Sequence, residues 1–61
     1  MNEEPIMQFF GYDHLPMSVR LVSKAFHDLA HEMLKLPRNA ERSVALRKLL
    51  EAKDAAVRAA L

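Results

Sequence analysis

A cationic stripe with an aromatic neighbour is the strongest chemical feature of this 61-residue sequence. Arg20, Lys24 and His27 follow one another at steps of four and three, which aligns side chains on one face of an α-helix. Tyr12 comes shortly before them. A ring beside a cation suits a small nucleotide, because the ring stacks on a base while the cation meets a phosphate. The alternative interpretation is a solvated helix face with a tyrosine packed over it.

Catalytic chemistry has little support in the sequence. His27 and His31 flank Asp28 at a spacing related to a zinc-protease motif, but Asp reaches a metal-bound water poorly and no third ligand has a compelling position. The serines lack a glycine-bearing elbow, and a single glycine excludes a phosphate-binding glycine-rich loop. We therefore expect no enzyme, metal or cofactor, with a metal-dependent hydrolase as a minor alternative.

Two helices must position the candidate residues. Apolar side chains at steps of three and four predict one helix over residues 16–36, with a single apolar seam formed by Val19, Val22, Phe26, Leu29, Met33 and Leu36. Pro37 ends this helix, because the residue before a proline is pushed out of the helical region. Asn39 is a good N-cap for a second helix over residues 40–60, which carries Arg47 and Lys48 on what reads as an exposed face.

An aromatic arm precedes the hairpin. Residues 1–15 read as an extended segment in which Phe9, Phe10 and Tyr12 surround Gly11, a residue that tolerates unusual backbone torsions. Such an arm must pack on something, since exposed phenylalanines form a sticky patch. The sequence thus predicts one all-α domain over residues 1–61, with an arm and an antiparallel helical hairpin.

Size and composition predict self-association. The chain is 51% hydrophobic and has no cysteine, so a partner subunit is the simplest source of missing core. No apolar run could span a membrane, and the N-terminus lacks a basic signal region, which favours a cytosolic compartment. Residues 1–37 carry three basic against five acidic side chains, and residues 38–61 carry six against three. A pI near 8.2 does not favour a binder of duplex nucleic acid.

Three segments resemble the phage anti-CBASS cyclic-nucleotide sponge family, CBASS being a bacterial anti-phage system that signals through cyclic oligonucleotides. They are residues 12–16, residues 20–26 and residues 41–52, and the most specific string runs from Ser43 to Ala52. The resemblance covers roughly residues 9–60 and implies a homohexameric helical bundle in the cytoplasm of the infected bacterial host. It further implies that the protein binds cyclic di- and trinucleotide messengers without degrading them, and that this sequestration blocks immune signalling.

The resemblance also implies site residues. In that family an arm tyrosine and a lysine of the first helix hold the cyclic dinucleotide between subunits, and Tyr12 and Lys24 match them. Arg20 matches a basic residue one turn earlier, and Lys48, with Arg47 beside it, matches a basic residue of the second helix. The chain departs from the family in a shorter stretch between tyrosine and lysine and in a second helix that ends in alanines. The alternative function is a small structural or adaptor hairpin that binds another protein through its apolar seam.

Overall fold

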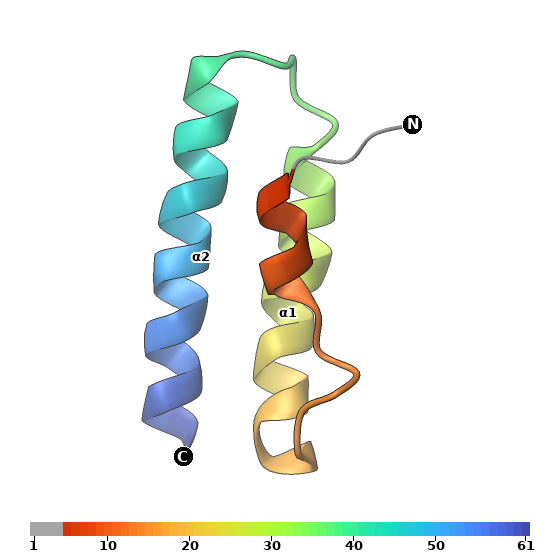
Figure 1. The fold of residues 1–61 in the computed structure, drawn as a ribbon, viewed down its shortest axis with the longest axis vertical. Helices are drawn as coiled ribbons and strands as arrows, with labels where there is room; N and C mark the ends of the chain where they lie inside the picture. Colours follow the sequence, from red (N-terminus) through yellow and green to blue (C-terminus); the bar gives the residue numbers. More distant parts are fainter. Residues whose placement is uncertain (1–4) are drawn as a thin grey trace.

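Two antiparallel α-helices and a short 3-10 helix form the fold of residues 5–61, the part of the chain that this computed structural model describes (Figure 1). The 3-10 helix η1 spans Pro5–Phe10, α1 spans Met17–Met33 and α2 spans Ala40–Ala60. The two α-helices pack side by side, and η1 contacts both. The predicted all-α hairpin with an arm is confirmed, whereas its assembly into a homo-oligomer stays a prediction.

The arm is not extended, as the sequence had predicted, but partly helical. Residues 5–10 form η1, in which the missing N–H of Pro5 costs nothing at the first position. The chain then reverses in a turn in which the backbone N–H of Leu15 donates to the carbonyl of Tyr12 at 3.1 Å. Gly11 has no positive φ, so the expected use of its conformational freedom is wrong. Residues 1–4, the predicted start of the arm, lie outside the described residues.

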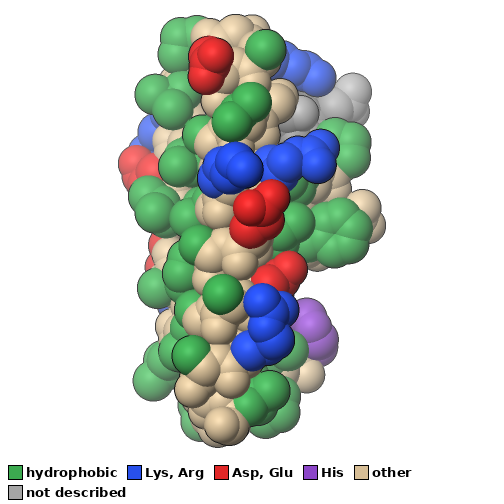
Figure 2. Space-filling model, turned by 90° about the vertical axis from the view of Figure 1, so that its left-hand side faces the viewer, with side chains coloured by type: hydrophobic (Ala, Val, Ile, Leu, Met, Phe, Trp, Pro, Cys, Tyr) green, Lys and Arg blue, Asp and Glu red, His purple; other side chains and the backbone are tan. Residues whose placement is uncertain are grey.

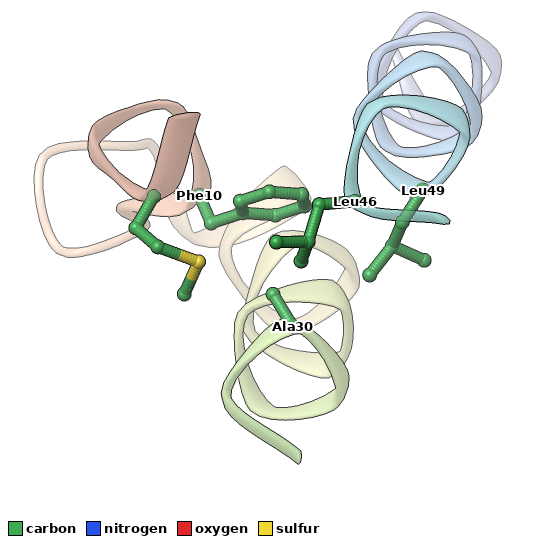
Figure 3. Packing of buried hydrophobic residues seen from close by; sticks show 5 residues of the cluster. Phe10, Ala30, Leu46 and Leu49 are labelled. Carbon is green, nitrogen blue, oxygen red and sulfur yellow. The ribbon is translucent and has the colours of Figure 1, made fainter. Parts of the chain in front are cut away.

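The core forms where η1 meets the hairpin. Phe10 is 0% exposed, and its ring lies between η1 and α2 above Ala30 of α1 (Figure 3). Leu46 points from α2 toward the same place, and Met7 and Leu49 complete the buried cluster. Burying a phenylalanine of this size stabilises the fold by about 1.5–3 kcal/mol. The arm is therefore part of the core through Phe10, as expected, whereas Phe9, which was expected to be covered too, is 54% exposed.

The predicted apolar seam of the first helix is only partly buried. Val19 is buried, but Leu29 and Leu36 remain about half exposed, which corrects their assignment to the seam. The buried line follows small side chains instead, because Ser23 and Ala30 are both fully covered. A small side chain allows a neighbouring segment to approach closely, and Phe10 packs over Ala30 in this way. Hydrophobicity alone could not have identified Ser23 as a core residue.

A buried arginine secures the turn between the two helices. α1 ends at Met33, three residues before the predicted end, and Leu36 N–H donates to the carbonyl of Met33 at 3.0 Å in a tighter turn. Arg42 of α2 donates from Nη1 to the carbonyl of Leu34 at 3.0 Å and to that of Leu36 at 3.2 Å. Carbonyls at a helix end need such partners. The early end of α1 therefore has a specific cause in α2.

The start of α2 follows the sequence closely. Asn39 adopts an extended conformation, and its Oδ1 accepts a hydrogen bond from the backbone N–H of Arg42 at 2.9 Å. The side chain thus satisfies one of the N–H groups that a helix start leaves without a partner. The predicted N-cap is confirmed, and α2 covers the predicted residues 40–60.

Large apolar side chains remain on the surface of the chain. Leu21 is 70% exposed, and the others with substantial exposure are Phe9, Met17, Leu29, Leu36, Val44 and Leu61. In the view toward α2, hydrophobic side chains lie along much of the left edge, with some charged ones between them, and several Lys, Arg, Asp and Glu side chains lie near the centre (Figure 2). No helix within residues 5–61 is both long and apolar enough to cross a membrane. The hairpin therefore has apolar surface that its own residues do not cover.

Candidate functional site

Tyr12 lies against the first helix through a ring contact with His27. The two ring centroids are 4.9 Å apart with an interplanar angle of 72°, an edge-to-face arrangement. The ring of His31, one helical turn further along α1, lies 4.4 Å from that of His27. Aromatic pairs favour such offset or edge-on geometries. Tyr12 of the arm and two histidines of α1 thus form a row of three rings, in which His27 contacts both of the others.

Lys24 lies beside this row in an ion pair. Its Nζ donates to Oδ2 of Asp28 at 2.8 Å, and the other oxygen of Asp28 lies 3.2 Å from Nδ1 of His27. The hydrogen bond to Asp28 raises the pKa of the Lys24 ammonium, and the charge of Asp28 adds to the effect. The hydrogen bond from Lys24, followed by that from His27, lowers the pKa of the Asp28 carboxyl. Tyr12 and Lys24 are thereby connected through His27 and Asp28.

Arg20 acts on the backbone that carries Tyr12. Its Nε and Nη2 donate to the carbonyl oxygen of Leu15, at 3.2 and 3.0 Å. Leu15 also closes the turn with Tyr12, so Arg20 holds the end of that turn against α1. The guanidinium suits this task because its donors form a rigid fork. Arg20 therefore has a structural role beside the ligand-binding role that the sequence suggested.

The two basic residues predicted from α2 lie apart from this group. Arg47 lines a cavity of about 330 Å³ between η1 and α2, together with Phe9 and Leu50, and a smaller one of about 140 Å³ beside it. Lys48 is exposed, with its Nζ 3.8 Å from Oε1 of Glu51. Within one chain, the structure brings together Tyr12, Lys24 and the turn held by Arg20, and it does not add Arg47 or Lys48 to them.

The histidine pair does not extend to a metal site in the described part of the chain. Within residues 5–61, no group of three or more His, Asp or Glu side chains is arranged to hold a metal ion. His27 instead contacts Tyr12 and Asp28, and His31 contacts His27 through its ring. Both histidines thus take part in ring contacts along α1, and that no metal binds them stays a prediction.

Two partners in the site were missed from the sequence. Asp28 is four residues after Lys24, and opposite charges at that spacing meet on a helix surface, so the signal for this pair was present. The acceptor of Arg20 is a backbone carbonyl in the turn, for which the sequence carries no side-chain signal. Spacing along a helix therefore predicts contacts within α1 but not contacts with the arm.

Comparisons of the chain with models of protein families, with curated proteins and with solved structures found no match.

Proposed function

We propose that the protein is a non-enzymatic sponge that binds and sequesters cyclic di- and trinucleotides, and thereby blocks CBASS signalling during phage infection. The observation that supports this most is the placement of Tyr12 beside Lys24. The arm supplies the ring, α1 supplies the ammonium, and His27 and Asp28 connect them. A plain hairpin needs neither an arm tyrosine nor a lysine at this point.

The proposed chemistry is recognition without bond cleavage. Tyr12 stacks on a base of the ligand, which is worth about 1–3 kcal/mol per base in proteins that bind single-stranded nucleic acid. Lys24 pairs with a phosphate, and Arg20 adds positive charge while it holds the turn that presents Tyr12. A cyclic dinucleotide has two bases and two phosphates, so two copies of the site related by a two-fold axis suit it.

Self-association is part of the proposal. Three cavities formed by residues 5–61 lie between η1 and α2 or at the turn between the helices, and neither Tyr12 nor Lys24 lines any of these three. A ligand held by Tyr12 and Lys24 therefore needs a further wall, which a second copy would provide. The exposed apolar side chains, Leu21 above all, supply surface for that contact. We propose a homo-oligomer, a homohexamer by the resemblance, in which Arg47 or Lys48 of a neighbour approaches the site.

The test is a binding titration with a panel of cyclic di- and trinucleotides that differ in base and in 2′,5′ or 3′,5′ linkage. Calorimetry gives the affinity, and chromatography of the ligand recovered after denaturation shows whether it is intact. We expect binding and full recovery. Tyr12→Ala removes the stacking contact and weakens binding about 5- to 150-fold, the equivalent of 1–3 kcal/mol. Lys24→Gln removes the phosphate partner and weakens binding as well.

Matched variants control for general effects of these substitutions. Phe9→Ala removes an exposed aromatic residue of the arm, and Lys35→Gln removes a lysine that pairs with Glu32 at 3.2 Å beyond the end of α1. Both variants should bind as the original protein does, and all four should retain its oligomeric state in sedimentation. Native affinity in both Tyr12→Ala and Lys24→Gln would show that the site is wrong, and recovery of a cleaved ligand would show that the protein is an enzyme.

The exposed apolar surface also fits a second candidate function, that of an adaptor hairpin. Leu21, Leu29 and Leu36 leave uncovered surface on the hairpin, where another protein could bind. The adaptor interpretation predicts no binding of any cyclic nucleotide and no effect of Tyr12→Ala. The same titration therefore distinguishes the two functions.

A further inference from the structure

Asp28 is the ion-pair partner of the Lys24 ammonium. Lys24 Nζ lies 2.8 Å from Oδ2 of Asp28, and this hydrogen bond raises the pKa of the Lys24 ammonium and lowers the pKa of the Asp28 carboxyl. The ammonium and the carboxylate are each about half exposed, so an incoming anion can reach them from solvent. A phosphate that approaches Lys24 meets the negative charge of Asp28 at the same time.

Asp28 has a second partner at hand. Its other oxygen, Oδ1, lies 3.2 Å from Nδ1 of His27, whose ring lies between those of Tyr12 and His31. His27 contacts the ring of Tyr12 from the arm and the side chains of Asp28 and His31 from α1. In the described chain, α2 adds no hydrogen bond, ion pair or ring contact to this histidine. Histidine is the side chain that ordinarily changes charge between pH 5 and 8.

We infer that the Asp28 carboxylate competes with the phosphate for Lys24, and that phosphate binding leaves this carboxylate paired with a protonated His27. This inference rests on the proposed function. When the phosphate takes Lys24, Asp28 is left beside a second negative group, and a positive imidazolium at 3.2 Å offsets that repulsion. The proton comes from solvent and stays on His27, and no covalent bond other than this N–H changes. Binding therefore takes up a proton, at most one per site, because His27 is the one group to which this inference assigns it.

Proton uptake has a direct calorimetric signature. The cyclic dinucleotide that binds best in the panel is titrated into the oligomer near neutral pH in PIPES and in Tris, two buffers that release protons with different enthalpies. We expect an apparent binding enthalpy that differs between the buffers, and an affinity that falls by up to tenfold per pH unit from pH 6 to pH 8. His27→Gln should bind without the buffer effect. His31→Gln is the matched control and should retain the effect, because His31 lacks a hydrogen bond to Asp28 in this structure.

The carboxylate is tested separately. Asp28→Asn removes the competing charge, and we expect about fivefold tighter binding at pH 8, the size of one unit-charge interaction across about 4 Å of water. Glu32→Gln, which removes the partner of Lys35, is the matched control and should change nothing. Binding that is independent of buffer and unchanged or weaker in Asp28→Asn would overturn this inference and leave the proposed function intact. No binding of any cyclic nucleotide by the original protein would overturn both.

Discussion

The two adjacent phenylalanines of the arm allow a sharp test of the core, because one is buried and the other is not. Phe10 is 0% exposed and packs with Ala30 and Leu46, whereas Phe9 is 54% exposed. Phe10→Ala removes a buried ring and leaves a cavity, which costs about 3–5 kcal/mol of unfolding free energy. Phe9→Ala, of the same chemistry one residue away, should stay below about 1 kcal/mol.

The expected loss is large against the stability of so short a chain. Folded domains have about 0.05–0.15 kcal/mol of unfolding free energy per residue, which gives roughly 3–9 kcal/mol for this length. Phe10→Ala should therefore lower the melting temperature by on the order of 12–40 °C, or leave the chain unfolded. Phe10→Leu keeps most of the volume and provides a variant that remains folded and measurable.

The assay is urea unfolding followed by the helical circular dichroism signal, at two protein concentrations. If Phe9→Ala and Phe10→Ala cost the same at both concentrations, η1 does not pack on the hairpin as described. If the cost of Phe9→Ala grows with protein concentration, Phe9 is covered in an assembly rather than in the single chain. Equal effects would thus refute the core assignment, and a concentration-dependent effect would locate a subunit contact.

The remaining predictions concern the start of α2 and the exposed apolar surface. Asn39→Ala removes the N-cap bond to the N–H of Arg42 and should cost about 1 kcal/mol of unfolding free energy, whereas Asn39→Asp should retain it, as measured in the same urea assay. Leu21→Glu alters a side chain that the single chain leaves 70% exposed, so monomer stability should change by less than about 0.5 kcal/mol while self-association is lost in sedimentation. Lys35→Gln, which lowers the net charge by the same one unit, controls for the charge, and a Leu21→Glu protein that still associates would place the interface elsewhere.

Helix-ending and helix-capping residues predicted those helix boundaries that depend on residues close in sequence. Pro37 and Asn39 predicted the interhelical turn, and α2 begins directly after the predicted cap. The helical content of the arm was missed, because residues 5–10 are too few to show a hydrophobic period and 3-10 helices have no strong composition. The end of α1 was placed too late, because the clamp from Arg42 to the carbonyls of Leu34 and Leu36 is a long-range contact.

The candidate site likewise combines contacts that the sequence predicts with contacts that it does not. Lys24 and His27 share a helix face by spacing, and Lys24 meets Asp28 by the same rule because the two are four residues apart. The contact of His27 with Asp28 joins adjacent residues, which helical spacing does not predict. The position of Tyr12 depends on a turn and on a backbone acceptor, neither of which the sequence displays. Assigning Arg47 to the same site required knowledge of how copies of the chain pack, which a single sequence does not contain.

Core and site are mechanically connected through the arm. Phe10 fixes the end of η1 in the core, and Tyr12 follows only two residues later. Arg20 fixes the other end of the turn at the carbonyl of Leu15. Tyr12 is thus held from both sides by residues that need not touch the ligand, so weaker binding in Phe10→Ala would reflect a displaced ring. Variants that test recognition must change Tyr12, Lys24 and Asp28 themselves, because the fold does not depend on their side chains for its core.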